Sequence, residues 1–229
     1  MIYVVGSTKN PFLNVPFRKK FFVDVKHKED NIDNMNPWYC ELTGLYHMWK
    51  HEKDDIVGLE HYRRYFLNDN NKILSEAEIR EALKDNDVIL RRFIFKDYGQ
   101  RDGFWWLEKD DVMKYFIEFL YQLNEPDFAM FTLHQLQVCP EFAQCNMFIA
   151  KREVMDKYCE WLFGHLKKLD FEKFKTYPRV MGYLTEFIFY AWLTYNKYKT
   201  TWRRTITFLH NDFTKVLEIT PGENDKKNV

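Results

Sequence analysis

The chain has 229 residues, enough for one substantial α/β domain and barely enough for two small ones. Its 34 basic residues balance 34 acidic ones, so the formal net charge is +0 and no overall positive field favours nucleic acid as a partner. Any bound anion must therefore meet a local cluster of charge. We expect a single domain over residues 1–220 and a disordered, polar tail over residues 221–229.

The cysteines and the N-terminus indicate the compartment. Four cysteines without a C-x-x-C pair predict neither a disulfide framework nor a zinc site, which favours reduced thiols in the cytoplasm. The first residues lack the basic region and the long apolar segment of a signal peptide, and no run is long enough to span a bilayer. We expect a cytoplasmic protein whose aromatic, basic C-terminal third allows peripheral contact with the inner face of the cell membrane.

Apolar periodicity predicts an alternation of strands and helices. A strand over residues 2–5 opens the chain, and a second short strand is expected over residues 21–25. A helix over residues 37–51 follows, with Asn36 as its N-cap. The remaining predicted elements are strands over residues 56–60, 87–90 and 145–150 and helices over residues 75–84, 110–123, 151–168 and 182–192. This β-α-β alternation predicts an α/β fold.

Local signals mark the ends of several helices. Ser75 and Glu78 have the spacing of a capping box, and Pro126 is expected to interrupt the helix that precedes it. Asp110 and Asp111 resemble a metal-binding acidic pair, but carboxylates are also favoured at the start of a helix. We therefore interpret this pair as a helix start.

The apolar strand over residues 56–60 ends in a group of charged side chains. In open α/β sheets, ligands bind at the C-terminal edge of the strands. Arg63 and Arg64 supply planar guanidinium groups suited to phosphate or carboxylate, whereas Glu60 and His61 could bind a metal or a hydroxyl. Because strand side chains alternate, Glu60 should point away from His61. The pattern predicts a site for an anionic ligand, with a solvated surface cluster as the alternative.

Two further segments carry polar groups next to predicted elements. Ser7 and Thr8 could present backbone N–H groups and hydroxyls to a nucleotide, although such a sequence is usually only a turn. Asn31, Asn36 and Glu41 could reach the hydroxyls of a sugar or nucleoside from a helix N-terminus. Ordinary helix capping competes for the same groups.

Glu186 lies within an apolar, aromatic helix. A buried acid requires a partner or a function, and the alternative is a position that faces solvent.

Several of these segments together resemble a known family. Residues 36–46 (NPWYCELTGLY) and 57–66 (VGLEHYRRYF) are followed in the same order by weaker motifs at 146–149 (NMFI), 158–163 (YCEWLF) and 182–186 (GYLTE). This pattern resembles a bacterial family of capsular and exopolysaccharide glycosyltransferases, long catalogued only as a domain of unknown function. Some of its members are described as galactofuranosyltransferases. The resemblance covers roughly residues 2–208.

The resemblance implies a fold and a ligand. The fold would be a single GT-A-like domain with a Rossmann-like central sheet flanked by helices, and a nucleotide-sugar would lie over the C-terminal ends of the strands. By that resemblance, Ser7 and Thr8 would lie near the nucleoside, and the segment over residues 31–41, with Asn31 and Asn36, near the ribose or sugar. Glu60, His61, Arg63 and Arg64 would lie near the diphosphate.

The sequence is compatible with metal-dependent and with metal-independent transfer. The usual Asp-x-Asp of GT-A enzymes is absent from the end of the central strand. Glu60 and His61 could hold Mn²⁺ or Mg²⁺, or the arginines could neutralise the leaving diphosphate without a metal.

The implied reaction is displacement of a nucleoside diphosphate from an anomeric carbon. In an inverting enzyme, a carboxylate or a histidine must deprotonate the acceptor hydroxyl. Glu186 is the first candidate for this base, Glu41 and His134 are weaker ones, and His61 is expected among the catalytic groups.

The resemblance also suggests partners and one competing function. The donor would be a UDP-sugar such as UDP-galactofuranose, and the acceptor a glycan or lipid-linked glycan in capsule, exopolysaccharide or O-antigen synthesis. A non-catalytic sugar- or nucleotide-binding module is the alternative. Nucleic-acid binding is disfavoured because the net charge is +0.

Overall fold

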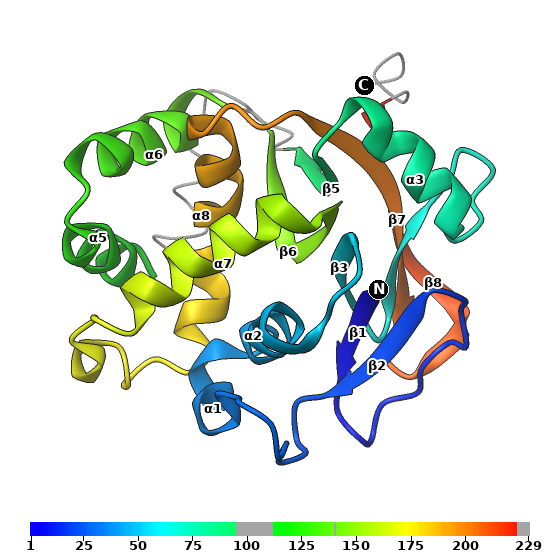
Figure 1. Ribbon diagram of the computed structural model, residues 1–229, viewed down its shortest axis with the longest axis horizontal. Helices are drawn as coiled ribbons and strands as arrows, with labels where there is room; N and C mark the ends of the chain where they lie inside the picture. Colours follow the sequence, from blue (N-terminus) through cyan, green and yellow to red (C-terminus); the bar gives the residue numbers. More distant parts are fainter. Residues whose placement is uncertain (95–111, 140, 224–229) are drawn as a thin grey trace.

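The computed structural model describes residues 1–94, 112–139 and 141–223 (Figure 1). The strands are β1 (Ile2–Gly6), β2 (Arg18–Phe22), β3 (Ile56–His61), β4 (Arg64–Leu67), β5 (Val88–Ile94), β6 (Glu141–Lys151), β7 (Thr200–Leu209) and β8 (Asp212–Thr220). The helices are α1 (Asn36–Tyr39), α2 (Leu42–His51), α3 (Glu76–Asp85), α5 (Val112–Leu123), α6 (Pro126–Val138), α7 (Arg152–Leu166) and α8 (Val180–Tyr195), with 3₁₀ turns at Asp33–Met35 and Phe171–Lys173. The predicted α/β class is confirmed.

The sheet is mixed and partly closed, which differs from the Rossmann-like sheet expected from the sequence. Its order is β2-β1-β3-β4-β7-β5-β6, and β6 pairs back onto β3, so that β3, β4, β7, β5 and β6 form a closed ring. Pairing is parallel for β2–β1–β3 and for β5–β7, and antiparallel for the other pairs. One reason is local: only Tyr62 and Arg63 separate β3 from β4, and so short a connection forces antiparallel pairing.

Helices cover both faces of the strands around β3. Val57 and Leu59 belong to the larger apolar core with α2, α5, α7 and α8, whereas Ile56 packs with α3 in a second core. Because successive strand residues point to opposite faces, Glu60 belongs to the α3 side and His61 to the α8 side. The sequence prediction that these two side chains diverge is confirmed.

Several predicted boundaries are accurate and others shift. The strands at residues 2–5, 56–60 and 87–90 and the helices at 151–168 and 182–192 all occur within a few residues of their expected ends, and Ser75 and Glu78 form the predicted capping box. The second strand lies earlier, at Arg18–Phe22, and Pro126 begins α6 instead of interrupting a helix. Asp110 and Asp111 lie outside the described residues.

The predicted helix over residues 37–51 is wrong near its start, because the chain breaks at Cys40. Cys40 has φ 50° and ψ −123°, which ends α1 before α2 begins at Leu42. Asn36 is the first residue of α1, and its side chain does not cap the helix. The break places Glu41 outside α1, at the N-cap position of α2.

The predicted tail also begins too early. Gly222 is buried, and its carbonyl accepts a hydrogen bond of 3.1 Å from Arg92 Nη1. The hydroxyl of Thr201 donates to Glu223 at 2.8 Å. Residues 221–223 are therefore part of the fold, and residues 224–229 lie outside the described chain.

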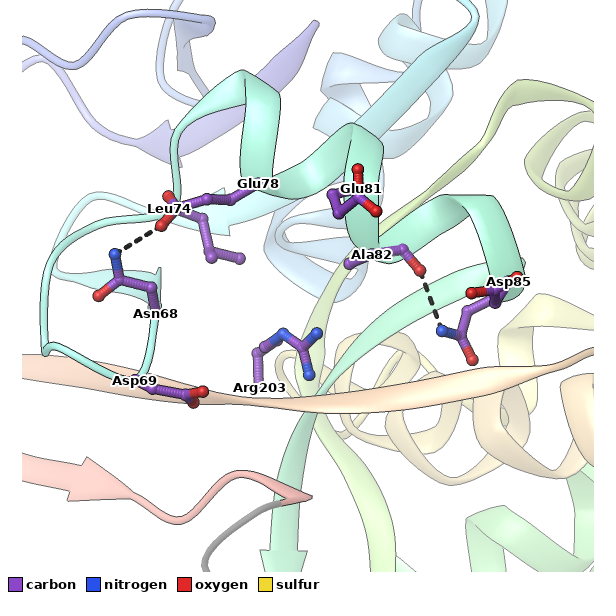
Figure 2. A pocket seen from close by; sticks show the side chains of 9 residues that line it. Asn68, Asp69, Leu74, Glu78, Glu81, Ala82, Asp85 and Arg203 are labelled. Atoms are coloured by element: carbon purple, nitrogen blue, oxygen red, sulfur yellow. Dashed lines mark hydrogen bonds between the residues drawn. The ribbon is translucent and has the colours of Figure 1, made fainter.

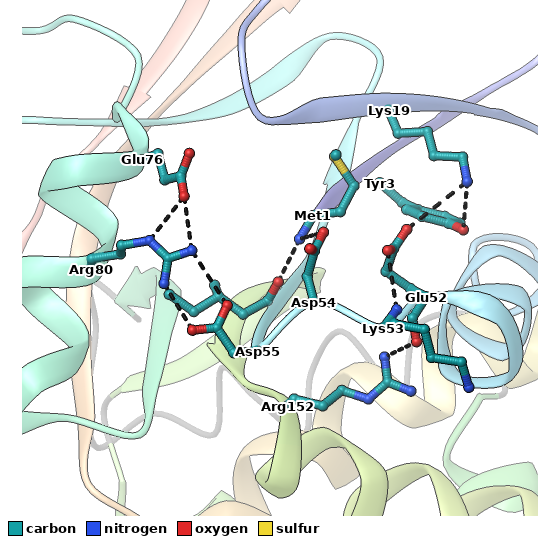
Figure 3. A network of polar contacts seen from close by, with 11 residues as sticks. Met1, Tyr3, Lys19, Glu52, Lys53, Asp54, Asp55, Glu76, Arg80 and Arg152 are labelled. Carbon is teal, nitrogen blue, oxygen red and sulfur yellow. Dashed lines mark hydrogen bonds and ion pairs between the residues drawn. The ribbon is translucent and has the colours of Figure 1, made fainter.

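Polar contacts fasten the end of the sheet where β1 and β3 begin (Figure 3). The Met1 amino group lies 2.8 Å from the Asp54 carboxylate and donates to the Ile56 carbonyl. Arg80 joins α3 to Asp55 at 2.8 Å. Arg152, the first residue of α7, donates to backbone carbonyls at the end of α2. These contacts stabilise the end of the strands that lies opposite His61.

Within the described chain, no helix combines the length and the apolar character that crossing a bilayer requires.

Candidate active site

The site lies on the α8 side of β3, where the break between α1 and α2 meets β6 and α8. Glu41 is only 7% exposed although it carries a carboxylate. It stands at the N-cap position of α2 without capping the helix through its side chain. Instead, its Oε1 accepts a hydrogen bond of 2.7 Å from Nδ2 of Asn146. Burial raises the pKa of Glu41, and the bond from Asn146 opposes that rise.

Asn146 owes its position to a distortion in β6. Cys145 and Asn146 both have left-handed backbone angles, with φ 66° and 49°. The pairing of β6 with β5 shifts register at this point, between Leu90 and Arg92. Two consecutive left-handed residues without a glycine are costly, and such strain persists only where the surroundings enforce it. Here the distortion turns the Asn146 side chain, which is 6% exposed, toward Glu41.

Asn146 also connects the site to α8. Its Nδ2 donates a second hydrogen bond of 3.0 Å to the carbonyl of Gly182. Glu186 lies four residues later, one helical turn along the same face. A Cβ atom at Gly182 would lie 3.6 Å from Glu41 Oε1, which shows how closely the helix approaches this carboxylate. Glu41 and Glu186 therefore belong to one site.

The carboxyl group of Glu186 has a raised pKa. Burial and, to a smaller extent, the negative charge of Glu41 raise the pKa of Glu186 to about 7. The backbone of Cys145, by a hydrogen bond, and the charges of Arg91 and Arg64 act in the opposite direction. A carboxyl group that titrates near neutrality can exchange a proton at physiological pH. The prediction that this acid is not an ordinary solvated side chain agrees with the geometry.

His61 and Arg64 form the adjacent part of the site. Arg64 Nη1 lies 3.1 Å from His61 Nδ1. Burial, followed by the charge of Arg64, lowers the pKa of His61 to about 3. The imidazole is therefore neutral at physiological pH, and the guanidinium beside it remains a cation.

Two further arginines complete the surroundings of the acid pair. Arg91 is 2% exposed and reaches Cys145 Sγ at 3.7 Å and Glu218 Oε2 at 3.0 Å. Arg179, at the N-cap of α8, donates from Nε to Cys40 Sγ at 3.3 Å. The charge of Arg91 stabilises the ionised form of Glu186, and the charge of Arg179 does the same for Glu41. Cationic groups thus surround both acids, buried Glu41 and half-buried Glu186.

Sequence reasoning missed Arg91, Arg179 and the role of Asn146. Arg91 carries a signal similar to the one that selected Arg64, because it directly follows the buried apolar residues 88–90 within β5. Asn146 opens one of the weaker family motifs, but nothing local indicates a left-handed bend. Arg179 has no such signal, since it reaches the site only through the packing of α8 against α1.

Glu60 has a structural position. Its side chain is fully buried and receives two hydrogen bonds from Arg18, from Nε to Oε2 at 3.1 Å and from Nη2 to Oε1 at 3.3 Å. The backbone N–H of Phe66 donates to the same carboxylate at 3.0 Å. Both oxygens are thus occupied on the α3 side of the sheet, away from His61.

Ser7 and Thr8 form a turn after β1, as the plainer interpretation expects. The Ser7 hydroxyl donates to Asn10 Oδ1 at 2.8 Å. Thr8 donates from its backbone N–H and its hydroxyl to Asp24, at 2.8 and 2.7 Å. A nucleoside at this edge would have to meet the Asp24 carboxylate as well, so the ligand role of Ser7 and Thr8 stays a prediction.

The remaining predicted residues are more peripheral to the acid pair. Asn31 organises its own loop by donating to the carbonyls of His27 and Glu29, at 3.0 and 2.6 Å. Arg63 lies in the turn after β3 with a half-buried side chain. His134 is exposed on α6. The structure brings together Glu41, His61, Arg64 and Glu186 from the predicted set.

No group of three or more His, Cys, Asp or Glu side chains among the described residues is arranged to hold a metal ion. A separate cavity of about 410 Å³ lies on the α3 side, between the β4–α3 loop, α3 and β7 (Figure 2). Its acids include Glu78, which already accepts hydrogen bonds from Asn68 and Ser75, so this cavity adds nothing to the site.

Comparison with known proteins identifies the family. The model of a family described as a domain of unknown function, DUF4422, matches residues 4–197, and the chain belongs to that family. This agrees with the resemblance, carried by the motifs, to a family catalogued as a domain of unknown function. Among curated proteins, none matches the chain.

One solved structure shares the fold. It is the apo structure of WbbM, described as a bifunctional glycosyltransferase, with a TM-score of 0.74 and 21% sequence identity. The match covers 95% of this chain and 46% of that chain, so the present chain spans about half the length of that protein. At this identity, the likeness shows the fold alone.

Proposed function

We propose that this member of the DUF4422 family is a glycosyltransferase with a GT-A-like domain that moves a sugar from a nucleotide-sugar to a glycan acceptor. The observation that carries the proposal is the pair of acids, buried Glu41 and half-buried Glu186, next to the cation of Arg64 at the turn that follows β3. Sugar transfer needs a base for the acceptor hydroxyl and positive charge for the leaving diphosphate, and this site holds both. The fold shared with WbbM supports the assignment.

Glu186 is the base in this proposal. A general base is most effective when its pKa lies near the working pH, and the pKa of Glu186 is about 7. Glu41 strengthens it, because a neighbouring negative charge increases the affinity of Glu186 for a proton. Asn146 keeps Glu41 in place by its hydrogen bond of 2.7 Å. Since the base acts in its ionised form, the rate should increase as the pH rises through about 7.

The donor is proposed to be a UDP-sugar, with its diphosphate near Arg64 and Arg63. UDP-galactofuranose is one such donor, and the product would enter capsule, exopolysaccharide or O-antigen synthesis. The acceptor would be a glycan or a lipid-linked glycan at the inner face of the cell membrane. These finer assignments come from the family resemblance; the acid pair and the arginines support sugar transfer in general.

The decisive experiment tests a panel of nucleotide-sugars with and without Mn²⁺, and measures release of the nucleoside diphosphate. Wild type should turn over at least one UDP-sugar. Glu186→Gln should retain UDP binding in calorimetry but lose turnover, and the Arg63→Ala/Arg64→Ala double variant should lose both while remaining folded by circular dichroism. UDP binding by wild type without any turnover would support the non-catalytic binding module instead.

A further inference from the structure

The contact between Arg64 and His61 determines which ring nitrogen carries the proton. A guanidinium group has five N–H donors and no acceptor. At 3.1 Å from Arg64 Nη1, the His61 Nδ1 atom must therefore be the acceptor. A neutral imidazole that accepts at Nδ1 carries its hydrogen on Nε2. The side chain of His61 is thus an N–H donor at its Nε2 end.

The surroundings of His61 keep it neutral. Burial has the largest effect on the pKa of His61, and the positive charges of Arg64, Arg91 and Arg179 act in the same direction. The backbone of Cys145 acts in the opposite direction. Protonation of the ring would also replace the Nδ1 lone pair that accepts the hydrogen from Arg64. The tautomer therefore persists across the physiological pH range.

Two donors at this place lack partners. His61 Nε2 and Arg64 Nε are both buried, and no atom of the described chain completes a hydrogen bond to either. The Cys145 backbone lies near the ring, but its geometry does not satisfy Nε2. Buried donors are rarely left unsatisfied in native proteins, and such groups often mark a position where a ligand binds. Two N–H donors, one of them on a cation, favour an anionic oxygen.

The same facts do not fit a metal ion on Glu60 and His61. Metal ligation requires a ring nitrogen with a free lone pair, but Nδ1 accepts from Arg64 and Nε2 carries a hydrogen. Glu60 points to the other side of the sheet, where Arg18 and the Phe66 N–H occupy its oxygens. These two residues cannot meet at one cation without breaking both arrangements.

We infer that His61 and Arg64 together bind an anionic oxygen of the donor diphosphate through Nε2–H and Nε–H, and that His61 acts as a neutral hydrogen-bond donor and not as a metal ligand or a base. The inference rests on the proposed function, which supplies the diphosphate. In the reaction, the acceptor oxygen forms a bond to the anomeric carbon and loses its proton to Glu186. The bond from that carbon to the phosphate oxygen breaks, and its electron pair remains on the diphosphate. The two donors stabilise that increasing charge.

Nitrogen NMR of ¹⁵N-histidine-labelled protein tests the tautomer directly. The chain has seven histidines, and the spectrum of His61→Gln assigns the missing signals to His61. We expect a neutral ring with the hydrogen on Nε2 between pH 5 and pH 8, unchanged by Mg²⁺ or by Cd²⁺ as a diamagnetic substitute for Mn²⁺. UDP and inorganic pyrophosphate should each shift the Nε2 signal. A hydrogen on Nδ1, loss of the Nε2 hydrogen on adding either metal, or no shift with either anion would overturn the inference.

Calorimetric titration with UDP shows whether His61 acts as a hydrogen-bond donor or as a metal ligand. His61→Ala should weaken UDP binding roughly 10- to 100-fold, as expected for loss of a hydrogen bond to a charged group. His61→Gln keeps an N–H donor near the Nε2 position and should restore most of the affinity, whereas His61→Glu should bind worse than His61→Ala. If His61→Glu binds UDP more tightly than His61→Gln when Mn²⁺ is added, His61 is a metal ligand and the inference is wrong.

These tests do not depend on turnover. A chain that binds UDP at His61 but transfers no sugar would contradict the proposed transferase and leave the donor role intact. If the protein turns over a nucleotide-sugar but UDP does not shift the NMR signals of His61, only the role of His61 as a hydrogen-bond donor is contradicted.

Discussion

Glu186 should destabilise the folded protein above neutral pH, because a base with a raised pKa carries a thermodynamic cost. Its pKa changes from an ordinary 4.5 to about 7 on folding. The folded state therefore binds more protons than the unfolded state between these two values, and stability falls as the pH rises through that window. Well above pH 7, the full change corresponds to roughly 3 kcal/mol, at about 1.36 kcal/mol per pH unit. Partial solvent contact reduces this, so we expect about 1–3 kcal/mol.

The variant Glu186→Gln tests this value. The amide has nearly the same shape but never ionises, so the variant should be more stable than wild type at pH 8.5 by about 1–3 kcal/mol. At pH 4.5, where the wild-type carboxyl is largely protonated in the folded state, the difference should nearly vanish. Urea denaturation at the two pH values measures both quantities. Glu160→Gln, at an exposed position on α7, is the matched control and should give no comparable difference.

Two results would refute the reasoning. A Glu186→Gln variant that is equally stable or less stable at pH 8.5 would mean that Glu186 is not a desolvated acid in the folded protein. A stabilisation of the same size at pH 4.5 and pH 8.5 would mean that the gain comes from packing and not from the charge. In either case, the raised pKa that supports Glu186 as the general base would be refuted. The expected outcome, greater stability with lost activity, is a trade-off typical of active sites.

Three further predictions concern the surroundings of the site. Asn146→Ala removes the donor that lowers the pKa of Glu41, so Glu41 is protonated more readily and its charge raises the pKa of Glu186 less; the acidic limb of the rate profile should move to lower pH and kcat/KM should fall roughly 10- to 100-fold, and an unchanged pH profile would deny this positioning role. Arg18→Met leaves the buried charge of Glu60 without its partner and should lower the free energy of unfolding by about 3–5 kcal/mol in urea titration, and a loss below 1 kcal/mol would contradict the buried pair. Gly58→Ala would place a Cβ atom 2.8 Å from a β6 backbone carbonyl, so the melting temperature should fall clearly, and an unchanged value would mean that β3 and β6 are not so closely paired.

The sequence predicted those elements whose signals are local. The capping box at Ser75 and Glu78 is an example, since both partners lie within one helical turn and their side chains bond each other's backbone N–H groups. The pairing of β3 with β6 joins residues about 90 positions apart and leaves no comparable local pattern, as expected for long-range strand pairing. The break at Cys40 escaped prediction because a left-handed cysteine is not encoded by its own side chain preference.

The site was predictable in part for the same reason. A carboxylate inside an apolar helix is visible in the sequence, and so is a pair of arginines after a buried strand. The partners that decide what these groups do come from elsewhere: Arg18 reaches Glu60 from β2, and Asn146 reaches Glu41 from a distorted strand. Spacing along the chain therefore identified candidate groups, but it could not show that Arg18 and the Phe66 N–H occupy the carboxylate of Glu60.

Because strand side chains alternate, the last two residues of β3 have different roles: Glu60 stabilises the fold and His61 faces the candidate site. Glu60 and His61 are adjacent in sequence, yet Glu60 is held by Arg18 and a backbone N–H, whereas His61 Nε2 has no partner within the described chain. A fold can keep an unsatisfied donor, two desolvated acids and a strained turn in one place only if neighbouring contacts over-determine that place. The buried Arg18–Glu60 pair anchors the last residue before His61 and so restricts the backbone that presents the imidazole. Glu60 therefore has a structural role although it lies next to the site. If the Glu60 side chain moved, the backbone of His61 would shift and its Nε2–H would no longer point at the same position.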